Sequence, residues 1–126
     1  PAPRTMPAMD DSNPPVRTLR DGGVAILELN RPQALNALDV PMARAFHDAV
    51  QALAGDATVR AVVVRGAGRA FGVGGDLAAM HAGDAGEVAM QLIGPLHAAV
   101  RMLQAMDAPV LASLHGAVAG GSMSLA

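Results

Sequence analysis

Glycine-rich turns that follow apolar runs are the features of this chain best suited to chemistry. The stretch 68–77 reads Gly-Arg-Ala-Phe-Gly-Val-Gly-Gly-Asp-Leu, and it follows a β-branched run and precedes a short helical pattern. Glycine lets another molecule approach the main chain closely. The first N–H groups of a helix lack partners, and with the helix dipole they attract an oxygen that carries negative charge. The stretch therefore predicts a backbone site for an anion or oxyanion, with an ordinary strand-to-helix turn as the alternative.

Two further stretches extend this pattern. Residues 108–126 read Ala-Pro-Val-Leu-Ala-Ser-Leu-His-Gly-Ala-Val-Ala-Gly-Gly-Ser-Met-Ser-Leu-Ala, which is again an apolar strand, a glycine loop and a helix start. Residues 30–38 read Asn-Arg-Pro-Gln-Ala-Leu-Asn-Ala-Leu. In this order and spacing, the three stretches resemble the enoyl-CoA hydratase/isomerase family, also called the crotonase superfamily. The resemblance runs from about residue 16 to the last residue, but the family carries several chemistries on one scaffold.

The resemblance implies an oxyanion hole made by two backbone N–H groups, one from each glycine loop. Matched position by position, these donors are Gly75 and Gly121. A thioester that loses an α-proton or is attacked develops negative charge on its oxygen, and each fixed donor can contribute about 3–4 kcal/mol there. The alternative is a pair of ordinary glycine turns.

The same resemblance implies a binding site for coenzyme A, which would enter as part of the substrate and not as a permanently bound cofactor. Backbone groups of one loop would contact the nucleotide and the pantetheine arm: Gln33, Ala34, Leu35 and Ala37. The first glycine stretch would continue the thioester pocket: Phe71, Gly72, Gly74, Asp76 and Leu77. For the first set the alternative is a packed connecting loop. For Asp76 a helix-start carboxylate is preferred over a general base.

One position departs from the hydratase pattern. In the hydratases a glutamate at the position of Ser124 helps to activate water, and serine is no strong base without a partner. A second acidic position would lie beyond residue 126. An acyl-CoA isomerase is therefore favoured over a hydratase, with a non-catalytic or truncated acyl-CoA-binding relative as the alternative. A structural α/β domain without a ligand is the third interpretation.

Other side chains offer weaker candidates. His115 is interpreted as structural, and Arg31 and Arg69 could lie near phosphates, although a lone surface arginine is more often solvated. No His, Asp and Glu cluster has the spacing of a metal site, so no metal is expected. The P-loop, the dinucleotide fingerprint and the Gly-x-Ser-x-Gly elbow are all absent from the sequence.

Composition excludes several classes of protein. A net charge of −2 and a pI near 6.0 argue against a nucleic-acid-binding protein. The absence of cysteine excludes disulfides and thiolate chemistry. No apolar run reaches the roughly 18 residues of a membrane helix, and residues 1–15 lack the apolar stretch of a signal peptide. We therefore expect a cytoplasmic protein that binds neither membrane nor nucleic acid.

The elements that must position these loops follow from the hydrophobic pattern. Strands are expected at 16–20 and 24–30 around an Asp-Gly-Gly turn, at 61–65 and at 110–114. A helix should begin after Asp39 and end at Gly55, with an apolar stripe: Met42, Ala45, Phe46, Ala49, Val50 and Leu53. A short helix is expected at 77–81, another from Asp84, and a new one near Gly94, because Pro95 would break a helix interior. Its apolar side would be Leu96, Val100, Leu103 and Met106.

These elements predict an α/β fold built as two strand–helix–strand units after a hairpin. The resemblance implies a crotonase-like (ClpP/crotonase) spiral of β-β-α units, truncated after the second glycine loop. We expect residues 1–15 to form a disordered tail, and residues 16–126 to form the N-terminal part of an acyl-CoA-binding domain. Family members are about twice this long and commonly form trimers or pairs of trimers. A chain of this length would expose apolar surface, so instability or association is expected.

Overall fold

A sheet of four strands in chain order forms the frame of the molecule. The computed structural model describes residues 13–76, 78, 83–120, 122 and 125–126. The strands are β1 (Val16–Asp21), β2 (Val24–Leu29), β3 (Ala61–Gly66) and β4 (Val110–Ser113). β1 is antiparallel to β2, whereas β2, β3 and β4 run parallel to one another. The four predicted strands are thus confirmed, with ends that differ by a residue.

The β1–β2 hairpin closes at the predicted turn. Asp21 pairs with Val24, and Gly22 between them has a φ of 61°, which glycine adopts without steric cost. The Glu28 carboxylate of β2 forms an ion pair with Arg17 of β1 at 3.2 Å and another with Arg65 of β3 at 3.0 Å. These cross-strand pairs match the register of β1, β2 and β3.

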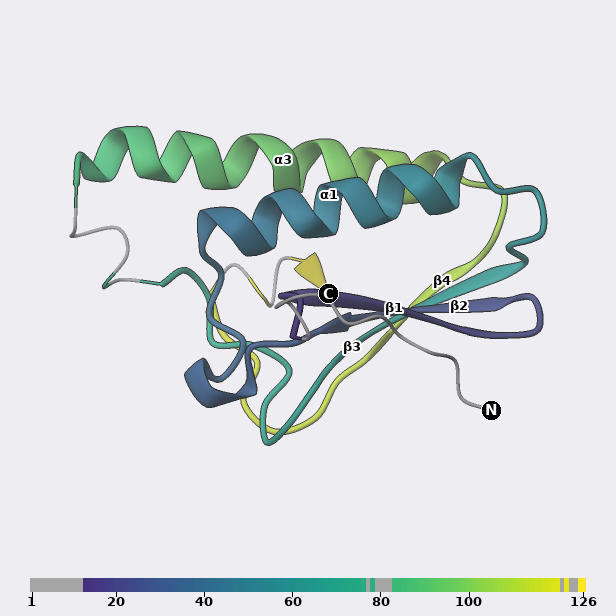
Figure 1. Ribbon diagram of the computed structural model, residues 1–126, viewed down its shortest axis with the longest axis horizontal. Helices are drawn as coiled ribbons and strands as arrows, with labels where there is room; N and C mark the ends of the chain where they lie inside the picture. The colour runs from purple at the N-terminus through teal and green to yellow at the C-terminus, as the bar shows by residue number, and fades with distance from the viewer. Residues whose placement is uncertain (1–12, 77, 79–82, 121, 123–124) are drawn as a thin grey trace.

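Two long helices lie side by side across one face of the sheet, as Figure 1 shows. α1 (Val40–Ala54) begins at Asp39, whose carboxylate accepts a hydrogen bond from the Met42 N–H at 3.0 Å, and it ends at Gly55. α3 (Ala85–Ala105) begins at Asp84, whose carboxylate accepts from the N–H groups of the first turn. α1 contacts β1 and β2, and α3 packs mainly against α1.

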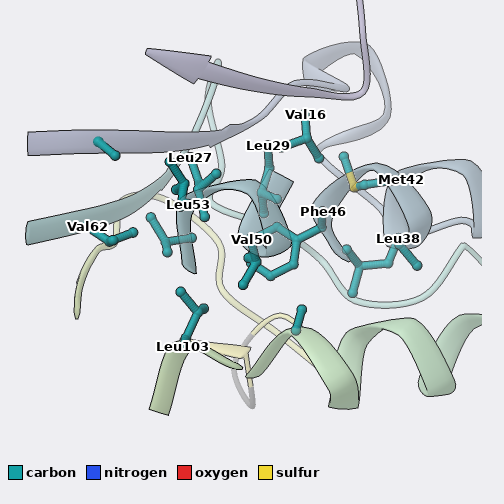
Figure 2. Close-up of a cluster of buried hydrophobic side chains, with 14 of the residues drawn as sticks. Val16, Leu27, Leu29, Leu38, Met42, Phe46, Val50, Leu53, Val62 and Leu103 are labelled. Carbon is teal, nitrogen blue, oxygen red and sulfur yellow. The ribbon is translucent and has the colours of Figure 1, made fainter. Parts of the chain in front are cut away.

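The core lies between the sheet and these helices. Alternate residues of β2 point toward α1, since successive side chains of a strand face opposite sides, and Ala25, Leu27 and Leu29 are fully buried. Figure 2 shows Phe46 and Val50 of α1 in the same cluster as Leu27 and Leu29 of β2 and Leu103 of α3. The predicted stripe of α1 is confirmed, and Ala43 is buried beside it.

The prediction of a new helix near Gly94 is wrong, because α3 continues through Pro95 without a break. Its buried and half-buried residues Leu92, Leu96, Ala99 and Leu103 keep helical spacing across the proline. Packing of this face against α1 outweighs the roughly 3 kcal/mol that an interior proline costs. The carbonyl that loses its N–H partner belongs to Gln91, a residue on the exposed side of the helix.

Two further expectations fall largely outside the described residues. These are most of the short helix at 77–81 and residues 1–12 of the expected tail. At the end of that tail, the Pro15 carbonyl accepts a hydrogen bond from the Asn30 N–H at 2.8 Å, and the Pro14 carbonyl accepts from the Asn30 side chain at 3.0 Å. No helix in the described part of the chain is long and apolar enough to cross a membrane.

Candidate active site

The three stretches singled out in the sequence lie at one edge of the sheet. In chain order, the first two follow β2 and β3, the third contains β4 and continues beyond it, and the carboxyl ends of parallel strands share an edge. We call residues 66–76 the first glycine loop and residues 114–122 the second glycine loop. Figure 1 shows both loops leaving the same end of the sheet. This is the edge at which open α/β sheets usually bind ligands.

The two glycine loops continue the pairing of β3 with β4 beyond the strands. The Phe71 N–H donates to the His115 carbonyl at 2.9 Å. The Gly72 N–H donates to the Ala117 carbonyl at 3.2 Å, and the Gly72 carbonyl accepts from the Ala119 N–H at 3.0 Å. The first loop is thus fixed along one side by the backbone of the second.

On its other side, the first glycine loop pairs with Leu38. The Leu38 N–H donates to the Gly74 carbonyl at 2.7 Å, and the Leu38 carbonyl accepts from the Asp76 N–H at 2.8 Å. Peptide groups alternate in direction along extended backbone, so the N–H of Gly75 between them points away from Leu38. Gly75 is half-buried, and its N–H donates to no acceptor within the part of the chain that the structure describes.

Asn36 connects the 30–38 segment to the first glycine loop. Its side chain is fully buried, and its Oδ1 accepts from the Arg31 N–H at 2.7 Å. Its Nδ2 donates to the carbonyls of Ala67 at 3.0 Å and Ala70 at 2.9 Å. Its φ of 56° is in the left-handed region, where asparagine is enriched. Sequence reasoning missed this role, although a lone amide in an apolar run is a signal for it.

Arg31 braces the same corner through its guanidinium group. Nη1 donates to the Ala37 carbonyl at 2.6 Å and lies 3.3 Å from the Asp39 carboxylate. Nη2 lies 3.2 Å from the carboxylate of Asp76, the residue after Gly75. With two carboxylates beside it, this arginine holds the loops together and is not a free phosphate ligand. The ion pair also suits a structural role for Asp76 better than that of a general base.

The residues expected to contact coenzyme A occupy different environments. Gln33 is exposed in the short helix η1 (Pro32–Ala34) and lines a surface pocket of about 370 Å³ together with Arg31 and Asp39. Ala34 and Leu35 are half-buried, and Ala37 is buried.

The predicted thioester-pocket residues lie in the first glycine loop. Phe71 is fully buried, and its side chain anchors the loop to the core. Gly72 and Gly74 are also buried, and both form backbone hydrogen bonds with neighbouring segments. Leu77, Gly121 and Ser124 lie outside the described residues. The His115 Nε2–H donates to the Gly68 carbonyl at 2.7 Å, a contact that suits the structural role expected of this histidine.

Ser122 is the second buried polar residue that sequence reasoning missed. It is fully buried, and its Oγ accepts a hydrogen bond from the Gly74 N–H at 3.2 Å. The contact joins the two glycine loops across 48 positions of sequence. Its sequence signal is a serine directly after the glycine pair of the second loop.

Comparison with known proteins extends these observations. A model of the enoyl-CoA hydratase/isomerase family matches residues 24–126. A probable enoyl-CoA hydratase of Mycobacterium tuberculosis is 36% identical over 112 residues, which cover 89% of this chain and 43% of that protein. The trans-2-decenoyl-acyl-carrier-protein isomerase of Streptococcus mutans is 35% identical over 112 residues, covering 84% of this chain and 41% of that protein.

The chain also resembles solved structures in its fold. An enoyl-CoA hydratase of Mycobacterium smegmatis has a TM-score of 0.82 at 39% identity, over 89% of this chain and 44% of that one. The chain thus spans less than half the length of these relatives. The predicted α/β fold of the crotonase type is confirmed. Since the family model matches well over half of the sequence, the chain belongs to the enoyl-CoA hydratase/isomerase family.

Proposed function

We propose that this chain forms the thioester-binding part of an acyl-CoA enzyme, in which the N–H of Gly75 stabilises negative charge on the thioester oxygen. The observation that carries the proposal is the direction of this N–H. Its neighbours on both sides are held by Leu38, and the N–H itself points away, half-buried and without an acceptor among the described residues. A fixed donor of this kind needs no reorganisation when the oxygen gains charge.

The chemistry that suits such a donor passes through an enolate. When a general base takes an α-proton from the thioester, the C–H electron pair moves onto the carbonyl oxygen, where two N–H donors would each contribute about 3–4 kcal/mol. Isomerisation of a 3-enoyl thioester is completed when the base returns the proton to the γ-carbon and the electron pair leaves the oxygen. By family resemblance the second donor is Gly121. The second glycine loop is hydrogen-bonded to the first, which supports donors from both loops acting on one oxygen.

Within this class we favour double-bond isomerisation over hydration. Ser124 stands where hydratases of the family carry a glutamate that activates water, and isomerases do not need that group. The relatives include both a named hydratase and a named isomerase. The same serine also favours a second candidate, an acyl-CoA-binding relative without catalysis.

The proposal includes the partners that the family resemblance implies. The ligand would be an acyl-CoA thioester, and the protein would act in the cytoplasm as a homotrimer or hexamer. Exposed apolar side chains on and beside β4 support association, because Leu111 is 57% exposed and Leu114 50% exposed.

Titration of the chain with acetyl-CoA and crotonyl-CoA by calorimetry tests binding. Incubation with crotonyl-CoA and with a 3-enoyl-CoA, followed by chromatography and mass spectrometry, then separates the reactions. Hydration adds the mass of water to crotonyl-CoA, whereas isomerisation converts the 3-enoyl-CoA into a 2-enoyl-CoA of equal mass and different retention time. We expect binding and isomerisation. Binding without any product would favour the non-catalytic relative, and no binding of either thioester would refute the proposal.

A further inference from the structure

The hydroxyl group of Ser122 lies where the two glycine loops approach most closely. Its Oγ accepts from the Gly74 N–H at 3.2 Å, and the side chain is fully buried. A Cβ placed on Gly72 would overlap this Oγ and lie 2.9 Å from the Ser122 Cβ. The hydroxyl therefore occupies space that only a glycine at position 72 leaves open.

Ser122 is itself held firmly in the second glycine loop. Its N–H donates to the Ala119 carbonyl at 3.2 Å, and its carbonyl accepts from the Ala126 N–H at 3.1 Å. Ala119 in turn donates to the Gly72 carbonyl at 3.0 Å. The backbone of Ser122 is thus fixed on both sides, and the burial of its side chain limits the rotamers open to the hydroxyl.

This hydroxyl restrains the residue that precedes the proposed oxyanion donor. Gly74 has a φ of 97°, a value that glycine adopts without steric cost. Because glycine has no Cβ, the peptide groups on either side of Gly74 rotate easily unless hydrogen bonds hold them. Its N–H is held by Ser122 and its carbonyl by the Leu38 N–H at 2.7 Å. That carbonyl and the N–H of Gly75 belong to one planar peptide group, so fixing the first fixes the direction of the second.

We propose that Ser122 is a positioning residue. Its hydroxyl holds the peptide between Val73 and Gly74, which limits rotation at Gly74 and so helps Leu38 to align the next peptide, between Gly74 and Gly75. In this way Ser122 sets how strongly the thioester carbonyl is polarised. The inference rests on the proposed function of Gly75. It adds that the second glycine loop acts on the first through a side chain. A change at Ser122 should therefore alter the oxyanion site without altering the core.

The first test needs no ligand. In Ser122→Ala the exchange rate of the Gly74 amide hydrogen, followed by NMR, should rise about tenfold, because a buried amide loses its acceptor. The Leu27 amide in the core should exchange at its original rate. An unchanged rate at Gly74 would overturn the inference.

A compensated variant separates the hydrogen bond from packing. In Gly72→Ala with Ser122→Gly, the added methyl group takes the space that the serine side chain leaves. This double variant keeps the site filled but has no hydroxyl, so the Gly74 amide should exchange as fast as in Ser122→Ala. If Ser122→Ala does not fold, the double variant still tests the hydrogen bond between Ser122 and Gly74. Protection equal to that of the original chain would count against the inference.

The second test reads the polarisation of a bound thioester. The carbonyl ¹³C signal of labelled crotonyl-CoA should move downfield when it binds to the original chain, and by less than half as much when it binds to Ser122→Ala. An equal displacement in both proteins would contradict the positioning role. If the original chain produced no displacement at all, the proposed function would fail, while the exchange rate at Gly74 would still decide whether Ser122 holds the peptide between Val73 and Gly74.

Discussion

Replacement of Asn36 by aspartate tests the idea that buried side-chain hydrogen bonds fix the first glycine loop. Asn36→Asp keeps the shape of the side chain and the oxygen that accepts from the Arg31 N–H at 2.7 Å. It removes the two donations from Nδ2 to the carbonyls of Ala67 and Ala70, at 3.0 and 2.9 Å. A carboxylate oxygen then faces two carbonyl oxygens in a fully buried position.

The magnitude follows from these two lost bonds. A buried carbonyl without a donor costs roughly 1–3 kcal/mol, so two carbonyls cost about 2–6 kcal/mol. We expect the free energy of unfolding at pH 7 to fall by about 4 kcal/mol, which is a large part of the 5–15 kcal/mol typical of a domain. Burial beside two carbonyls would hold the pKa of the new carboxyl above its ordinary value of about 3.9. The loss should therefore shrink as the pH is lowered toward about 4, where the carboxyl is protonated.

Urea unfolding followed by circular dichroism at pH 7 and pH 4.5 measures this loss. Asn13→Asp is the matched control, because it makes the same chemical change at an exposed residue and should alter stability by about 0.5 kcal/mol at most. A loss below about 1 kcal/mol in Asn36→Asp, or one that does not depend on pH, would refute the role assigned to this amide.

Two further predictions concern elements away from the loops. Pro95→Ala should raise the free energy of unfolding by about 1–3 kcal/mol, because it restores a donor for the Gln91 carbonyl inside α3; no gain in urea unfolding would mean that the helix is already adapted to the proline. Thr58→Val should raise the pKa of Asp56, measured by NMR titration, because the Thr58 hydroxyl is the main group that holds it below 3.8, ahead of the Thr58 N–H. A carboxyl whose pKa is lowered in the fold stabilises the fold above pH 3.8, and this stabilisation disappears on acidification. The variant should therefore lose less stability than the original chain when the pH is lowered below 3.8.

The placement of the candidate site could be predicted from the sequence because it depends on local signals. Apolar runs predicted β2, β3 and β4, and parallel strands bring the segments that follow them to one edge. Asp39 and Gly55 similarly mark the ends of α1, through a cap that acts within one turn.

The contacts that shape the site could not be predicted in the same way. Asn36 reaches carbonyls 31 and 34 positions away, and Ser122 reaches Gly74 across 48 positions. No local periodicity encodes such pairings, since they depend on how neighbouring loops are packed. Pro95 shows the same limit in a helix, where packing of Leu92 and Ala99 against α1 overrides the local rule.

The central claim is that the N–H of Gly75 polarises a thioester carbonyl. Its most direct measurement is the carbonyl ¹³C signal of labelled crotonyl-CoA bound to Gly75→Pro, which has no N–H, and to Gly75→Ala, which adds a Cβ but keeps the N–H. We predict a downfield displacement with the original chain and with the alanine variant, and its loss with the proline variant. A displacement that survives in Gly75→Pro, or that disappears equally in both variants, would contradict the claim.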